Sequence, residues 1–183
     1  VEWTVTSRPG HFSPPGWDEF TFGTWTPWWD YGFFRRDDSD GEEETLEGRT
    51  DSSGRHRLRL DFLGVEPPRA TSVEASAAVT DVNRQTWSST VTMLVHPADQ
   101  YVGLKAARTF VEAGQPIRLE AIVPDLEGKA LAGRPIHVRS ARLDYDTRGR
   151  DWREIEVDVT EQTVQSATRP VAVTVQPKQG GTW

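Results

Sequence analysis

The stretch from Thr109 to Arg139 alternates apolar and polar side chains, and this alternation constrains the fold more than any other feature of the chain. A period of two places one face of a strand on a core and the other face largely toward solvent. The alternating apolar positions are Ile117, Leu119, Ala121 and Val123, and then Ile136 and Val138 after a connection with turn residues at Asp125, Gly128 and Gly133. The stretch therefore predicts two strands joined by a turn-rich connection.

The same alternation recurs along the rest of the chain. It predicts strands at residues 1–6, 58–62, 73–79, 87–95, 101–105, 155–159 and 171–175, with a further strand starting at 180–183. Between Ile136 and Tyr145 the apolar residues change parity by one position, which predicts a β-bulge near Ser140. The sequence has no convincing amphipathic helix. We therefore expect an all-β protein of antiparallel, Ig-like β-sandwiches.

The length of the chain fits two such sandwiches in tandem. At 183 residues it is long enough for two domains of about 90 to 100 residues each. The break at His96–Asp99 predicts a first domain at 1–97, with a Trp-rich and acidic insertion at about 8–47, and a second domain at 98–183. Because Val1 opens inside a predicted strand, we expect the first domain to be N-terminally truncated and to lack its leading strands. We expect the second to lack its last strand.

Charge and composition argue against several classes of partner. The net charge is −7, and Lys and Arg form no basic stripe, so we expect no nucleic-acid partner. No apolar run approaches the roughly 20 residues that span a bilayer, so we expect no direct membrane insertion. With no cysteine in the sequence, disulfides, thiolate metal sites and a Cys nucleophile are excluded.

A dense group of aromatic residues lies in the predicted insertion. The candidate packing or partner-contact surface consists of Trp17, Phe20, Phe22, Trp25, Trp28 and Trp29, and Tyr31, Phe33 and Phe34 extend it. Each ring buries roughly 150 to 250 Å² when covered, so exposing all nine would be costly. We expect the segment to fold back as a small core over one end of its sandwich, or to pack between domains. The alternatives are a sugar-stacking platform and a docking patch for a partner.

Other groups of polar residues favour structural roles over catalysis. The tract from Arg35 to Glu44 lacks the spacing of a calcium loop and predicts a solvated hairpin tip. The histidines, which are His11, His56, His96 and His137, are too dispersed for a metal site. Glu154, Glu156 and Asp158 share one strand face, whereas a glycosidase needs two carboxylates across a cleft. We therefore expect no catalytic residues, no metal and no cofactor, and we expect that the chain is not an enzyme.

Several segments resemble one known family. They are PPGWDEFTFGTWTPWW with its acidic continuation, EGRTDSSGRHRLRLDF, ATSVEASAAVTDVNRQTWSS, the run from HPADQYVGLKAARTF to AGRPIHVR, and the closing GGTW. Together they cover nearly the whole chain and resemble the macroglobulin-type domains of bacterial alpha-2-macroglobulin-like proteins. The aromatic-rich segment is the most specific of them, because turn-and-strand segments occur in many β-sandwich families.

The resemblance implies a scaffold segment of a broad-spectrum protease inhibitor of the bacterial cell envelope. In that family a protease cuts a bait segment, the molecule rearranges, and the protease is trapped, often through a thioester. The family's thioester motif has a Cys shortly before Glu-Gln, and Glu161-Gln162 has no such Cys, so it does not match. The implied partners are neighbouring macroglobulin-type domains of the same parent chain and, through the full-length protein, target proteases. The implied location is the periplasm or the exterior, with the parent anchored like a lipoprotein. The alternative function is a cell-surface adhesin or carbohydrate-binding module that uses the Trp-rich loop.

Overall fold

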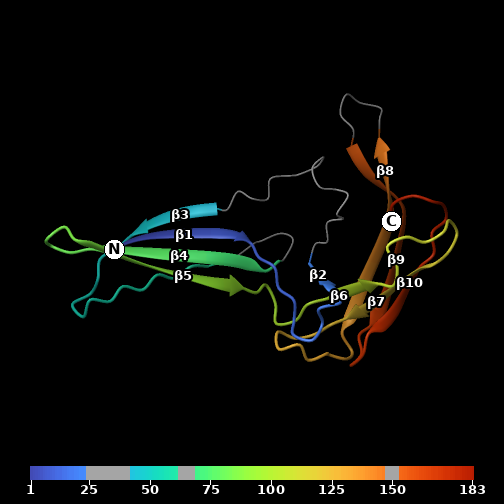
Figure 1. Cartoon of the computed structure of the whole chain (residues 1–183), viewed down its shortest axis with the longest axis horizontal. Helices are drawn as coiled ribbons and strands as arrows, with labels where there is room; N and C mark the ends of the chain where they lie inside the picture. The colour runs from blue at the N-terminus through green and yellow to red at the C-terminus, as the bar shows by residue number, and fades with distance from the viewer. Residues whose placement is uncertain (24–41, 62–68, 147–152) are drawn as a thin grey trace. The chain divides into compact units, whose positions relative to one another are not determined.

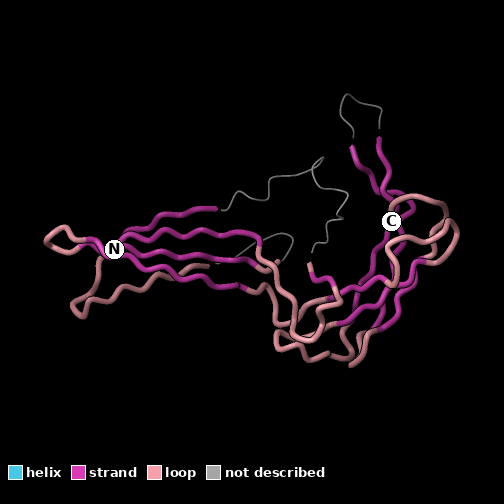
Figure 2. Tube along the Cα trace, viewed as in Figure 1, coloured by secondary structure: helices cyan, strands magenta, loops and turns pink. Residues whose placement is uncertain are grey.

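The computed structural model describes residues 1–23, 42–61, 69–146 and 153–183. These residues form ten β-strands and no helix (Figures 1 and 2). Each pairing between the described strands is antiparallel, so the predicted all-β, antiparallel class is confirmed. The contacts divide the chain into two compact units, residues 1–12 with 25–98 and residues 13–24 with 99–183.

Unit 1 contains a four-stranded sheet in the order β3-β1-β4-β5 (Figure 1). Its strands are β1 (Glu2–Pro9), β3 (Glu42–Glu47), β4 (Thr71–Thr80) and β5 (Thr86–Val95). On one face Val5, Val73 and Ala75 are buried, and Trp3, Leu58, Leu60 and Val95 pack against them. The other face of β1 carries Glu2, Thr4, Thr6 and Arg8, so the alternation in the sequence corresponds to the two faces of the sheet.

The strand predicted at residues 58–62 is wrong for the part that the structure describes. Leu58 and Leu60 are half-buried against the unit 1 core, but residues 55–61 run past it as a loop without pairing into a ladder. Alternation records which side chains face a core, whereas a strand also needs a neighbour for its main-chain hydrogen bonds. Phe62, the last residue of this prediction, lies outside the described residues.

Unit 2 is a sandwich of two layers. One layer is a four-stranded sheet in the order β10-β7-β6-β2. Its strands are β2 (Thr21–Phe22), β6 (Gly103–Ala106), β7 (Ile117–Ile122) and β10 (Val171–Val175). The other layer is the hairpin of β8 (Pro135–Asp146) and β9 (Arg153–Gln165). Ala121, Val123, Ile136 and Val173 form the core that joins the layers, and they are at most 3% exposed.

The predicted bulge is confirmed in the β8–β9 hairpin. Ser140 lies opposite Thr160, and Arg142 lies opposite Val157. Between these two pairs β9 therefore contains one residue more than β8. Asp158 lies within this interval with φ of 53°, in the left-handed region that few non-glycine residues adopt. The other predicted strands are present, except that residues 180–183 contribute a single bridge from Thr182 to Leu143.

Three aspartates close turns in the same way. In each of Asp51, Asp81 and Asp125, the side-chain oxygen Oδ1 accepts hydrogen bonds from the main-chain N–H groups two and four residues later, at 2.7 to 3.1 Å. The third residue after each aspartate has positive φ, and these residues are Gly54, Arg84 and Gly128. The turn residues Asp125 and Gly128 therefore predicted their turn correctly, because Asp side chains bond to nearby main-chain N–H groups and glycine tolerates positive φ.

The start of the predicted insertion lies in a different unit from the one expected. We expected residues 8–47 to belong to the first domain, whereas residues 13–24 have their contacts in unit 2. The division near residue 98 falls at the predicted break. The domain boundaries of 1–97 and 98–183 remain a prediction. In the described part of the chain, no helix has the length and hydropathy that crossing a bilayer requires.

Candidate functional site

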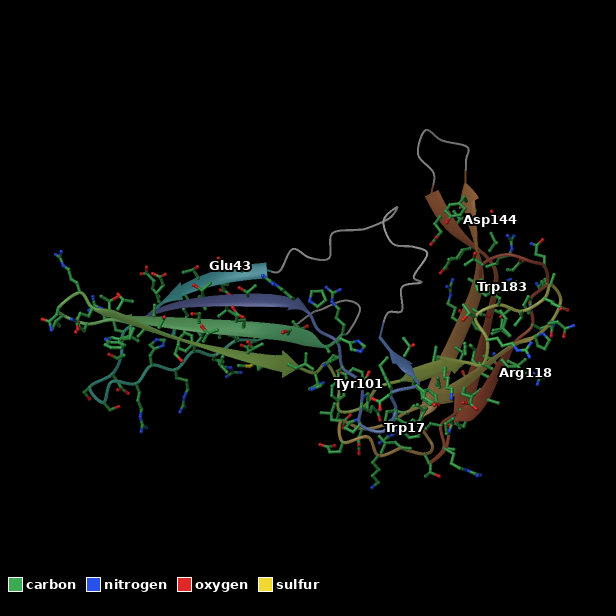
Figure 3. All side chains as sticks on the ribbon, in the orientation of Figure 1. Trp17, Glu43, Tyr101, Arg118, Asp144 and Trp183 are labelled. Atoms are coloured by element: carbon green, nitrogen blue, oxygen red, sulfur yellow. The ribbon has the colours of Figure 1, made fainter. Side chains whose placement is uncertain are left out.

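Trp17, Phe20 and Phe22 form a small aromatic cluster in unit 2, which we call the aromatic cap. Phe20 and Phe22 are buried at 8% and 3% exposure and pack with Ile122, which is fully buried. Trp17, Tyr101 and Ala130 pack against this group, and Figure 3 shows the side chains at Trp17 and Tyr101. The rings of Trp17 and Phe20 meet edge to face, with centroids 5.5 Å apart, which is a favoured aromatic geometry.

The aromatic cap covers the outer face of the unit 2 sheet. Ile122 lies opposite Gly103 in the ladder, and Gly103 lies opposite Phe22. A Cβ atom at Gly103 would come within 2.5 Å of the Phe22 ring, so the glycine leaves the space that the ring occupies. The outer face of β7 otherwise carries Arg118 and Glu120, which are exposed. The cap therefore buries Ile122 on a face of β7 that is otherwise polar.

Trp17 is held by the turn that Asp125 closes. Its indole Nε1–H donates a hydrogen bond of 2.8 Å to the carbonyl oxygen of Gly128. Gly128 has φ of 86°, and a Cβ atom there would overlap the carbonyl oxygen of Pro15. Only glycine suits both demands, the positive φ and the close approach of the main chain. The segment from Pro14 to Trp17 is thereby fixed against the Asp125 turn.

An ion pair joins the cap segment to β6. The Lys105 ammonium donates to the Glu19 carboxylate and lies 5.8 Å from the centroid of the Phe20 ring. This hydrogen bond raises the pKa of Lys105 and lowers the pKa of Glu19. Because Glu19 is exposed, the pair serves to orient the segment and contributes little stability. Burial also raises the pKa of Tyr101, which lies beside the cap.

The predicted site residues are only partly described. Trp17, Phe20 and Phe22 come together in the aromatic cap. Trp25, Trp28 and Trp29 lie outside the described residues, as do Tyr31, Phe33 and Phe34. Sequence reasoning did not single out three residues that help to hold the cap in place, which are Gly103, Lys105 and Ile122. Gly128 could be predicted as a turn residue, because an Asp followed by Gly at the third position favours such a turn. Its contacts with Pro15 and Trp17 could not be predicted from the sequence.

Two of the histidines, His56 and His137, make hydrogen-bond contacts with neighbouring side chains. The Nδ1 atom of His56 accepts a hydrogen bond of 3.0 Å from the indole N–H of Trp3. His137 is exposed, and its Nδ1 atom lies 3.1 Å from the hydroxyl of Thr163. In the ranges that the structure describes, no three His, Asp or Glu side chains are grouped to hold a metal ion.

The carboxylates of β9 pair with arginines of β8. The Glu156 carboxylate lies 2.6 Å from Arg139, which lowers the pKa of Glu156. Asp158 accepts hydrogen bonds from Gln179 at 3.0 Å and from Arg142 at 3.2 Å, and these bonds lower the pKa of Asp158. We expected Asp158 to share one solvated face with Glu154 and Glu156. The bulge instead places its side chain in a partly buried pair, at 24% exposure.

The polar tract at 35–44 is described only at its end. Residues 42, 43 and 44 lie in β3 and pair in that order with Ser7, Thr6 and Val5 of β1. The expected hairpin tip is therefore wrong for these three residues. The strand neighbour β1 provides the main-chain partners that this sequence pattern does not reveal. Residues 35–41 of this tract lie outside the described residues.

A hollow lies on the surface of the β8–β9 hairpin. It measures about 560 Å³ and is lined by residues 137–139 and 161–163. Its charged side chains are already paired, since Arg139 lies 3.8 Å from Glu161 and also bonds Glu156. The hollow is therefore an open polar strand surface. The contact between the Thr163 hydroxyl and the His137 imidazole within it is exposed to solvent.

Comparison with known proteins identifies macroglobulins as relatives. No family model matches the sequence. The whole chain aligns with an alpha-2-macroglobulin homolog of Nostoc at 23% identity, covering 10% of that protein. A segment of 107 residues, 57% of the chain, is 33% identical to 3% of the circularly permutated Ras protein 2 of Dictyostelium discoideum. The chain thus spans a tenth or less of the length of these curated relatives, and a match of 3% brings no Ras activity to it.

Solved structures of macroglobulins share the fold. The chain superposes on E. coli alpha-2-macroglobulin in its native conformation with a TM-score of 0.52 at 14% identity, covering 96% of this chain and 12% of that one. A Salmonella alpha-2-macroglobulin reacted with methylamine gives a TM-score of 0.49 at 14% identity, covering 96% of this chain and 13% of that one. The resemblance to bacterial alpha-2-macroglobulin-like proteins is therefore confirmed along the whole chain in sequence, and the fold is of the macroglobulin type.

Proposed function

We propose that this chain, which resembles bacterial alpha-2-macroglobulins from end to end, is a scaffold segment of a protease-trapping inhibitor. We call the longer protein that contains it the parent protein. The similarity over the whole chain to the Nostoc homolog carries the proposal. In this proposal the chain is not an enzyme, and its partners are the neighbouring domains of the parent and, through the parent, the trapped proteases.

The geometry of unit 2 supports a scaffold role, in which a rigid domain holds other parts of the parent protein at fixed distances. Its aromatic cap directs two buried rings and one indole N–H inward, onto Ile122 and Gly128. Rings used in this way stabilise a rigid sandwich, and rigid sandwiches can keep a cleavable segment and a capturing surface at fixed distances. The carbohydrate-binding alternative depends on Trp25, Trp28 and Trp29, which lie outside the described residues, so it remains a prediction.

We propose a cell-envelope location, in the periplasm or outside the cell, with the parent anchored to a membrane. The absence of cysteine from the chain is compatible with this location, because sandwiches of this size bury enough core to fold without disulfides.

Caging of a protease tests the function directly. Trypsin incubated with the parent protein should lose activity on a large substrate such as casein, while it keeps activity on a small chromogenic peptide. A cage excludes proteins by size but leaves the active site of the protease intact. A parent protein that leaves casein digestion unchanged, or that blocks both substrates equally, would rule out a trap.

The 183-residue chain is the control in this assay. We expect it to change neither activity, since a scaffold segment alone encloses nothing. Inhibition by the chain itself would make it an inhibitor module in its own right and would contradict the scaffold role.

A further inference from the structure

One half of the apolar face of the unit 1 sheet is uncovered. The register places Val79, Trp87, Val91 and Met93 on the same face as the buried residues Val5, Val73 and Ala75. Val73 is fully buried, whereas Val79, Met93, Val91 and Trp87 are exposed at 40%, 45%, 52% and 75%. We call these four residues the β5 patch. It continues the unit 1 core toward the edge of the sheet.

The composition of β5 differs from that of an edge strand that faces water. Natural edge strands carry Lys, Pro or a bulge, which discourage pairing with other strands. The ten residues of β5 read TWSSTVTMLV and contain no charged residue, no Pro and no Gly. The pairing of β5 with β4 runs over all ten residues without a register shift. Such a strand is suited to burial rather than to solvent.

A second layer already covers the other half of this face. Leu58 and Leu60 pack on the core formed by Val5, Val73 and Ala75, and His56 accepts the hydrogen bond from Trp3. Arg57 and Arg59 lie between these residues and are exposed, so residues 55–61 alternate as one strand of a covering layer would. Yet among the described residues no strand pairs with this segment. In the part of unit 1 that the structure describes, residues 55–61 are thus the one segment that packs over this face of the sheet.

We propose that a further β-strand of the parent protein, from outside this chain, lies beside residues 55–61 and packs on the β5 patch. The inference rests on the proposed function, because it takes the strand from a longer parent protein. Its relatives have the length for it, since the chain spans 10% of the Nostoc homolog. The chemistry of the patch specifies an occupant with aliphatic or aromatic side chains at alternate positions, which would close a second sheet over the first.

Oxidation of Met93 tests the proposal without any substitution, because Met93 is the one methionine of the sequence. Peroxide attacks an exposed thioether faster than a buried one. We expect Met93 to oxidise in the folded 183-residue chain within about threefold of its rate in urea, and about tenfold more slowly in the folded parent protein. Peptide mass spectrometry of the region that contains Met93 gives both rates.

A pair of cysteine substitutions gives a matched control on opposite faces of β5. Val91 lies on the patch, and Thr90 lies on the other face, where its hydroxyl bonds that of Ser76. In the parent protein Thr90→Cys should react with a maleimide while Val91→Cys is protected. In the 183-residue chain both variants should react. If a cysteine variant does not fold, the oxidation rate of Met93 in the unsubstituted protein still tests the proposal.

The outcomes separate the possible occupants and the two proposals. Equal reaction of both cysteines in the parent, or fast oxidation of Met93 there, overturns the inference even if the parent cages trypsin. Protection that grows with the concentration of the 183-residue chain makes a second copy the occupant, and protection in its monomer places the occupant within this chain; both overturn it. A parent that protects Met93 but does not cage trypsin contradicts the proposed function alone.

Discussion

At the scale of single residues, two positions hold unusual backbone conformations for different reasons. Arg84 completes the Asp81 turn with φ of 64°, although the equivalent positions in the other two Asp turns are glycines. Asp158 adopts φ of 53° in the bulge of β9, where Arg142 and Gln179 bond its carboxylate. The conformation of Arg84 is strained, and in the described part of the chain no hydrogen bond or ion pair of its side chain offsets that strain. The conformation of Asp158 is held by specific partners.

We expect Arg84→Gly to stabilise unit 1 by up to about 1 kcal/mol, because glycine adopts positive φ without a steric penalty. Chemical denaturation followed by circular dichroism measures the change. Arg84→Ala is the matched control, since it removes the same side chain but keeps the strain, and it should leave stability nearly unchanged. Equal effects of the two variants would show that the side chain matters and the backbone does not.

The pKa of Asp158 makes the stability of unit 2 depend on pH in a defined direction. Hydrogen bonds from Gln179 and Arg142 lower this pKa below the ordinary value of 3.8. A carboxylate with a lowered pKa stabilises the folded state above the ordinary value, and this contribution is lost as the pH falls through the folded-state pKa. Asp158→Asn removes the charge and keeps a residue that tolerates positive φ.

We therefore expect Asp158→Asn to have a lower melting temperature than the unsubstituted chain at pH 6. The difference should persist to about pH 4 and shrink below the ordinary value of 3.8. Thermal melts across this range provide the measurement. A difference that stays constant down to the lowest pH would mean that the ion pair contributes nothing.

At the scale of elements, β2 shows how a two-residue strand can matter to a whole layer. Phe22 pairs opposite Gly103 and, with Phe20, buries Ile122 on the outer face of the sheet. The bond from Trp17 to Gly128 fixes the same segment to a turn more than 100 residues away in the sequence. The cap therefore depends on four elements together: the segment 14–22, β6, β7 and the Asp125 turn.

We expect Phe22→Ala to destabilise unit 2 by about 3–5 kcal/mol, the usual range for truncating a buried phenylalanine. Phe22 is 3% exposed, whereas Phe110 in the same unit is 72% exposed. Phe110→Ala is thus the matched control and should cost less than about 1 kcal/mol. Urea denaturation monitored by circular dichroism distinguishes them, and similar losses for both variants would contradict the cap as a structural element.

At the scale of the whole molecule, the chain is acidic and its described charges are largely paired or solvated. It has 28 acidic and 21 basic residues, which gives the net charge of −7. The Arg side chains on β8 bond carboxylates of their own hairpin, at Glu156, Asp144 and Asp158. They are therefore not available as a row of phosphate contacts.

We expect the chain to leave the fluorescence anisotropy of a labelled DNA duplex unchanged at about 10 µM protein and physiological salt. Non-specific DNA binding requires neutralisation of several phosphates by free Lys or Arg. A cytochrome c titration is the positive control for a basic protein of small size. Saturable binding by this chain would show that its local charge distribution outweighs its net charge.

The sequence by itself determined the class of fold, most of the strands, the bulge near Ser140 and the Asp125 turn. These features follow from local rules: alternation with a period of two, a change of parity, and residues that favour turns. The same rules assigned the buried face of β4 correctly, at Val73 and Ala75. They also placed Leu58 and Leu60 on the core side of their segment.

Only the tertiary structure decided which segments are neighbours. It placed residues 13–24 in unit 2, left residues 55–61 outside any ladder, moved Asp158 into a pair with Arg142, and left the β5 patch exposed. The physical reason is that alternation specifies which side chains seek a core, whereas the identity of that core depends on contacts between residues far apart in the sequence. Trp17 and Gly128 are 111 residues apart, and the local sequence around either residue does not predict its contact with the other.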